Sequence, residues 1–203
     1  MVYVPNAPAA ESGPKFSAPV FVAEFVNEYD PVKPGMDRPR TLRAEQGVER
    51  LYPLSYRSSG WPRWTPWPRV TGKALARALA DELSHSGLFS SVRAVDALSG
   101  LPEEALVIQV AIRDAALRVR GNEPGTYSLA LELTAYNRSP DNIYSPGREF
   151  WRKTLSRSAE YRGRHPAYDL NDMLRPLYAE ALKQIAPAYE AERAREEAQR
   201  LLR

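Results

Sequence analysis

Residue types that could perform acid–base or nucleophilic chemistry are sparse in this sequence. It holds two histidines, His85 and His165, and no cysteine. His85 is predicted to lie in the last turn of a helix, where the helix dipole favours a cation at the surface. His165 lies in a polar loop beside Pro166. Neither histidine has neighbours spaced like those of a catalytic triad. We therefore predict that the protein has no catalytic residue and is not an enzyme.

The carboxylates do not form a recognisable ligand pattern either. They cluster at Glu103–Glu104, at Asp141 and at Asp169–Asp172, where turns, loops and helix starts use such residues. The sequence has no Walker loop, dinucleotide fingerprint or EF-hand loop, and without cysteine it has no thiolate zinc site. We expect neither a metal nor a cofactor, and no small-molecule substrate is evident.

Three of the four tryptophans recur at every third position and are interleaved with prolines. A polyproline II helix has three residues per turn, so Trp61, Trp64 and Trp67 would align along one edge. One interpretation is a buried lid over the sheet or the first helix, which we favour because burial is the commoner fate of large indoles. The other is a docking ridge for a partner, a lipid interface or a glycan, flanked by Arg63 and Arg69.

A second group of candidate partner-binding residues combines cations with an aromatic ring. Trp151, Arg152 and Arg157 lie in and just after a predicted strand. Cations mixed with aromatic rings are typical of nucleic-acid surfaces. The net charge of only +3 disfavours nucleic acid, and a solvated strand edge is the alternative. A phosphate-bearing partner of any kind is favoured over nucleic acid alone.

The first half of the chain predicts a strand, a helix and a second strand. Residues 20–26 are β-branched and aromatic, which indicates a strand. From Thr71 onward, Leu75, Leu79 and Leu83 form one apolar stripe at helical spacing. Gly87 is placed where a helix ends in a left-handed residue, and residues 91–95 read as the next strand.

The second half predicts an antiparallel meander and a closing helix. Apolar residues alternate over 106–112 and over 127–133, which indicates two strands, and residues 149–155 are expected to form a third strand of the meander. The apolar parity slips by one residue after Asp114, which predicts a β-bulge. The last helix carries an apolar stripe as far as Ile185, and Pro187 is expected to kink or break it.

These elements predict an α+β fold, with an antiparallel sheet in the order β-α-β-β-β-β-α and two helices packed on one face. We expect a flexible tether over residues 1–18 and a single α+β domain over 19–186. That domain contains a Pro/Trp-rich irregular loop over 35–69, and a charged helical extension follows over 187–203.

The string from Thr71 to Val92 contains Ser86-Gly-Leu-Phe89 and resembles the first helix and following strand of small bacterial envelope lipoproteins. These include ABC-type transport auxiliary lipoproteins, the lipopolysaccharide-assembly lipoprotein and the amino-terminal domain of the Tol translocation protein. The resemblance covers roughly residues 19–186 in topology. It implies a non-enzymatic adaptor in envelope transport or assembly, anchored in the outer membrane through a lipidated N-terminal cysteine, and it assigns no functional residue.

The start of the chain fits that expectation. Residues 1–10 read like the tether of a mature secreted protein, so Met1 is interpreted as replacing a removed leader. No apolar run reaches the ~18 residues of a membrane span. We predict a periplasmic or outer-membrane-associated protein with a protein partner and an N-terminal lipid. The alternatives are a structural subunit of a secretion, pilus, motor or tail assembly, and a nucleic-acid-binding module that uses the basic aromatic face of the sheet.

Overall fold

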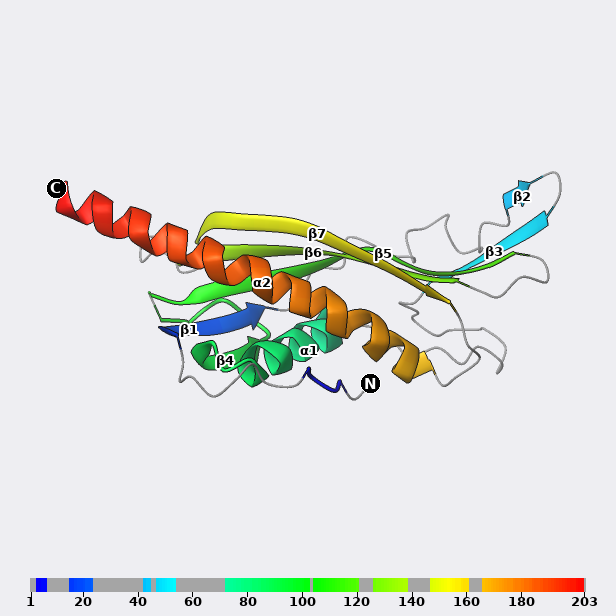
Figure 1. Ribbon diagram of the computed structural model, residues 1–203, viewed down its shortest axis with the longest axis horizontal. Coiled ribbons are helices and arrows are strands. Elements are labelled where there is room, and N and C mark those ends of the chain that lie inside the picture. Colours follow the sequence, from blue (N-terminus) through cyan, green and yellow to red (C-terminus); the bar gives the residue numbers. More distant parts are fainter. Residues whose placement is uncertain are drawn as a thin grey trace.

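The computed structural model describes residues 3–6, 15–23, 42–44, 47–53, 72–102, 104–120, 126–138, 147–160 and 166–202, with the backbone alone described at 42–44, 47–53, 72, 114–120 and 166–169. Seven strands and two helices occur in these ranges (Figure 1). In chain order they are β1 (Phe16–Ala23), β2 (Leu42–Ala44), β3 (Gly47–Pro53), α1 (Gly72–His85), β4 (Phe89–Val95), β5 (Leu106–Arg120), β6 (Thr126–Asn137), β7 (Arg148–Glu160) and α2 (Pro166–Leu201).

The strands form one mixed sheet in which β4, β1, β5, β6 and β7 lie side by side. The meander of β5, β6 and β7 is antiparallel, as predicted. The prediction of an antiparallel sheet is wrong for β1, which runs parallel to both β4 and β5. Because α1 follows β1 and precedes β4, it acts as a crossover between parallel strands.

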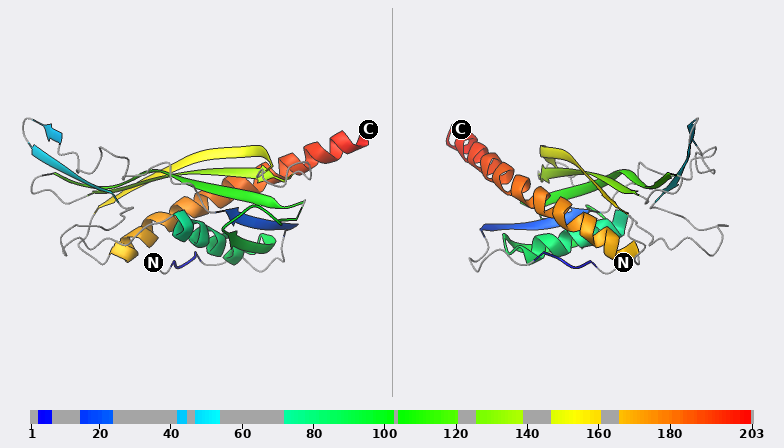
Figure 2. Two further views of the ribbon diagram at one scale, coloured as in Figure 1. Left: turned by 180° about the vertical axis from the view of Figure 1, so that it is seen from behind. Right: turned by 45° about the vertical axis from the view of Figure 1, so that its right-hand side comes forward.

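Two short strands lie in the range that was expected to be an irregular loop. β2 and β3 pair with each other, and β3 pairs antiparallel with the C-terminal part of β5. β5 therefore has two partners along one edge, β1 at its start and β3 at its end. Figure 2 shows that this extension carries the sheet well beyond the helices. The prediction of a loop over 35–69 is thus corrected for residues 42–44 and 47–53.

The predicted bulge in β5 is confirmed. Ile112 pairs with Leu131, while Asp114 pairs with the next residue of β6, Ala130, so that Arg113 is the extra residue. The shift keeps the apolar positions of both halves of β5 on one face of the sheet. Leu117 accordingly pairs with Tyr127, which is buried.

Both helices cover the apolar face of the sheet (Figures 1 and 2). The α1 stripe of Leu75, Leu79 and Leu83 is wholly buried, as predicted. Tyr178 of α2 is also buried and donates a hydrogen bond to the Leu75 carbonyl over 2.9 Å, which joins the two helices. At the end of α1, Gly87 has a φ of 68°, the left-handed conformation expected there. The sheet side of this core is supplied by Leu106, Ile108, Val110, Ile112, Leu129, Leu131 and Leu133.

The last helix continues through two prolines, so of the predicted kink or break at Pro187 the break does not occur. A proline removes the hydrogen bond to the carbonyl four residues earlier. At Pro187 that carbonyl belongs to Lys183, and both residues are exposed, so water can replace the lost donor. Ile185 and Tyr189, on the opposite side of the helix, are buried and hold α2 against the domain.

The N-terminal segment contacts the domain where a flexible tether was expected. Tyr3 is buried against Tyr178, with ring centroids 5.7 Å apart. Phe16 begins β1 and packs against Phe89 and Tyr189. Residues 3–6 and 15–18 are therefore parts of the packed structure.

Candidate binding surface

Five of the predicted partner-binding residues, Trp61, Arg63, Trp64, Trp67 and Arg69, lie outside the described residues. Whether the tryptophans form a lid or a docking ridge therefore stays a prediction. The other three lie on β7, where their positions can be compared.

The structure separates the three candidates of β7 onto opposite faces of the sheet. Trp151 pairs with Ala135 and Arg157 pairs with Leu129, so both face the helices. Arg152 pairs with Thr134 and faces the other way. Trp151 is half-buried and packs against the core. The single basic aromatic surface that was predicted for a nucleic acid is thus divided between two faces.

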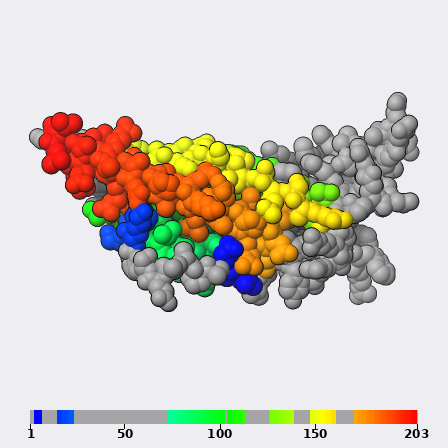
Figure 3. Space-filling view, viewed as in Figure 1, coloured from blue at the N-terminus to red at the C-terminus, as the bar shows by residue number. Residues whose placement is uncertain are grey.

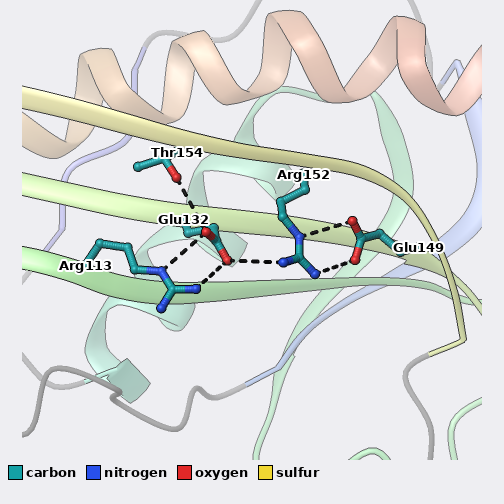
Figure 4. Close-up of polar contacts among 5 residues, drawn as sticks. All are labelled: Arg113, Glu132, Glu149, Arg152 and Thr154. Carbon is teal, nitrogen blue, oxygen red and sulfur yellow. Dashed lines mark hydrogen bonds and ion pairs between the residues drawn. The ribbon is translucent and has the colours of Figure 1, made fainter.

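The face of the sheet that the helices leave open carries a network of charges (Figure 4). Glu132 accepts hydrogen bonds from Arg113 over 2.7 Å and 3.3 Å, and from the Thr154 hydroxyl over 3.5 Å. The Arg152 guanidinium lies 3.9 Å from the Glu132 carboxylate. It also forms a bidentate ion pair with Glu149, in which Nε donates a hydrogen bond of 3.1 Å and Nη2 donates the other. The network spans β5, β6 and β7 and uses Arg113, the residue that the bulge adds.

The network holds its members in their charged forms. Hydrogen bonding by Arg113 lowers the pKa of Glu132, opposed by partial burial and helped by the charges of Arg113 and Arg152. Hydrogen bonding to Glu149 raises the pKa of Arg152. Arg152 is therefore already paired. The sequence did not reveal Arg113 and Glu132 as partners, because their pairing depends on the register between β5 and β6. It did not reveal Glu149 either, because a register shift between Ala135 and Tyr136 places Glu149 on the same face as Arg152.

The outer edge of the sheet at β7 is the second surface feature. Of the strands that the structure describes, only β6 pairs with β7. Figure 3 shows the residues of β7 on the surface beside α2. On the helix side of β7, the exposed cations Lys153 and Arg157 flank the buried Leu155. On the open side, Thr154, Ser156 and Ser158 follow Arg152.

A buried carboxylate fastens the N-terminal segment to the two helices. Glu82 of α1 is 3% exposed and accepts hydrogen bonds from the Tyr3 hydroxyl and the Asn6 backbone N–H, each over 2.9 Å. The Asn6 amide side chain also donates to Glu82, and it bonds the Arg175 carbonyl over 3.0 Å. Burial, followed by the bond to Glu82, raises the pKa of Tyr3. We call this group of Tyr3, Asn6, Glu82 and Arg175 the N-terminal clasp.

A third polar cluster fixes the helix beyond Pro187. Arg148, at the start of β7, contacts the buried Glu192 and lies 3.2 Å from Glu196. Asn137 of β6 donates to Glu196 over 2.6 Å. Residues as far as Glu196 are therefore attached to the sheet, whereas Leu201 is 83% exposed.

None of these clusters is a metal centre in the described part of the chain, where no group of three acidic or histidine side chains could hold an ion. Neither described helix is both long and apolar enough to cross a membrane.

Comparisons with known proteins establish the fold and no more. No family model matches the chain, and no curated protein matches its sequence. Among solved structures, protein XCC0632 from Xanthomonas campestris, of the family DUF330, superposes with a TM-score of 0.61 at 11% identity. The match covers 95% of this chain and 97% of that one. The chain shares the DUF330 fold.

This match supports the resemblance of residues 71–92 at the level of the fold. The hypothetical protein CT253 from Chlamydia trachomatis gives a TM-score of 0.44 at 12% identity, covering 83% of this chain and 95% of that chain.

Proposed function

We propose that this protein is a non-enzymatic adaptor of the bacterial envelope, located in the periplasm or tethered to the outer membrane, with a role in transport or assembly. The observation that carries the proposal is the fold, shared with a DUF330 protein over nearly the full length of both chains. That fold is the one of transport auxiliary lipoproteins. The adaptor works by binding a protein partner.

The electrostatics of the open face support binding over catalysis. Acid–base catalysis uses groups whose pKa values are brought toward the working pH. In the network of the open face the pKa of Glu132 is lowered and that of Arg152 is raised, so both move away from neutrality. Such a surface keeps a fixed pattern of charge, which gives a partner specificity and a defined orientation.

Cell fractionation tests the location. Antiserum against the protein should detect it in the periplasmic or outer-membrane fraction of the cells that produce it. External protease should degrade it only after the outer membrane has been permeabilised. Detection in the cytoplasmic fraction alone would contradict the proposal.

Photo-crosslinking in these cells tests the adaptor role. A photoreactive amino acid in place of Thr154, on the open face, should give a discrete adduct with an envelope protein. The same amino acid in place of the exposed Lys183, on the solvent side of α2, serves as the control and should give none. Absence of an adduct from Thr154 and from its exposed neighbour Ser156 would count against this face as the binding surface.

A second candidate function, a structural subunit of a larger assembly, is favoured by the end of α2. Leu201 and Leu202 are 83% and 87% exposed, and the helix projects past the sheet (Figure 1). Size-exclusion mass with and without residues 197–203 distinguishes the two functions. An adaptor stays monomeric in both forms, whereas a subunit that assembles through this end loses its oligomers on truncation.

A further inference from the structure

The edge of the sheet at β7 has the features of a strand-accepting surface. β7 has 13 residues, and no described strand other than β6 pairs with it. It contains no proline, and its register with β6 is continuous from Trp151 to Glu160. In an antiparallel strand, alternate residues direct both backbone polar groups to the outer side. A row of evenly spaced donors and acceptors therefore lies along this edge.

The opposite edge of the sheet is a poorer surface for the same purpose. β4 has 7 residues and so offers about half as many positions. β7 lies beside α2 (Figure 3), and its other face belongs to the open face of the sheet. Side chains of an added strand can therefore be recognised on both faces.

The side chains along β7 indicate which kind of strand fits. On the helix side, Lys153 and Arg157 stand on either side of Leu155, at alternate positions of that face. Both cations are exposed, and no ion pair joins either of them to the described part of the chain. On the open side, Thr154, Ser156 and Ser158 are small and carry hydroxyl groups. The edge thus presents cation, apolar residue and cation on one face and hydroxyl groups on the other.

We propose that β7 binds an extended acidic segment of a partner protein as an additional strand of the sheet. The segment carries two carboxylates four residues apart, opposite Lys153 and Arg157, with an apolar residue between them opposite Leu155. Backbone hydrogen bonds supply the affinity, and the side-chain pairs supply the specificity. The inference deepens the proposed function and rests on it, since it names the partner chemistry of the adaptor.

A second copy of this chain fits the edge less well. An antiparallel pair of β7 strands that places Leu155 opposite Leu155 also places Lys153 opposite Arg157 at both ends. Like charges directly opposite each other destabilise a strand pair. Charged residues on an edge strand deter aggregation, and the same two cations favour a segment of opposite charge.

The test uses the full chain and a labelled peptide, acetyl-Thr-Glu-Thr-Val-Thr-Glu-Thr-amide, with binding followed by fluorescence anisotropy. The variant K153E/R157E should bind this peptide at least about tenfold more weakly, because two attractive pairs become repulsive. It should instead bind the matched peptide in which lysine replaces glutamate. The control K183E/R193E changes the net charge equally at two exposed positions of α2 and should leave binding unchanged.

Two further measurements separate strand addition from attraction between charges alone. Two peptides N-methylated at alternate amides, one in each register, keep their charge. The peptide whose methylated amides face β7 cannot form the ladder and should fail to bind. Hydrogen exchange of the backbone amides of residues 152–158 should slow when the unmodified peptide is added.

Three results would overturn the inference: no binding at peptide concentrations up to about 1 mM, binding of both N-methylated peptides as tight as that of the unmodified peptide, or self-association that protects residues 152–158 without peptide. The outcome is independent of the fractionation test. A cytoplasmic protein that binds the peptide would refute the envelope location and keep the strand site. An envelope protein that does not bind the peptide would keep the location and refute the strand site.

Discussion

The two faces of the sheet use the same strands for different purposes. On β6, Leu131 is fully buried under the helices, while the side chain of the next residue, Glu132, is 17% exposed in a network of charges. The covered face is stabilised by removing apolar surface from water, a contribution that depends on close packing. The open face is held by ion pairs, which contribute little stability near solvent. The apolar core thus lies mainly on one face, while the other carries the network of charges on β5, β6 and β7.

The largest expected effect tests the covered face. Leu131→Ala removes buried methyl groups and leaves a cavity beneath the helices, which should lower the free energy of unfolding by about 3 kcal/mol. Urea denaturation followed by circular dichroism measures the change. Thr154→Ala, on the open face, is the matched control and should change stability by less than about 0.5 kcal/mol. Equal losses in the two variants would abolish the distinction between the faces.

The N-terminal clasp extends the comparison to a buried charge of α1, Glu82. Glu82→Gln keeps the shape of the side chain but replaces an acceptor of three hydrogen bonds by a group that must also donate. We expect a loss of about 2 kcal/mol and faster hydrogen exchange at Asn6. Glu197→Gln, at an exposed position of α2, should have no measurable effect. Unchanged exchange at Asn6 would show that Glu82 does not hold the segment.

The next effect concerns the attachment of α2 to the sheet beyond Pro187. Arg148→Ala leaves the buried Glu192 without its cation and should cost about 1–2 kcal/mol. Amide exchange in residues 190–198 should accelerate, while exchange in residues 174–185 should not. Arg193→Ala, on the exposed side of the same helix, is the control. If residues 190–198 exchange no faster, apolar contacts of Tyr189 with Phe16 and Phe150 suffice to hold the helix.

The smallest effect lies on the open face and depends on pH. The folded-state pKa of Glu132 is lowered, so its ion pairs stabilise the protein above the unfolded pKa of about 4.3 and this stability is lost as the pH falls through the folded pKa. Glu132→Gln should therefore cost less than about 1 kcal/mol at pH 7. The difference from the unmodified protein should shrink in acid and in about 1 M salt. A difference that persists at pH 2 would mean that Glu132 acts by packing.

The sequence was sufficient for elements whose signals are local. The leucine stripe of α1 and the left-handed Gly87 depend only on neighbouring residues, and both were predicted. The bulge was also predictable, because the alternation of apolar residues shifts by one position after Asp114, and this shift can be read from the sequence of one strand alone.

Features that depend on distant pairing were not predictable. β1 lies between β4 and β5 and runs parallel to both. The end of β1 at Ala23 and the start of β4 at Phe89 are 66 positions apart in the sequence. The residues of Phe16–Ala23 do not indicate whether the strands beside them run parallel or antiparallel. The continuity of α2 through Pro187 likewise depends on tertiary packing of Ile185 and Tyr189, which outweighs the local preference for a break. The pairing of Arg113 with Glu132 required both the bulge and the register.

The N-terminal clasp also determines how the molecule would respond to mechanical force. A force applied to the chain ahead of Tyr3 loads the hydrogen bonds of Tyr3 and Asn6 to Glu82 before it loads β1, because both residues precede the strand. Glu82 transmits that load to α1, and Asn6 shares it with α2 through Arg175. The load therefore divides between the two helices, and β1, hydrogen-bonded on both sides, is shielded until the clasp has given way.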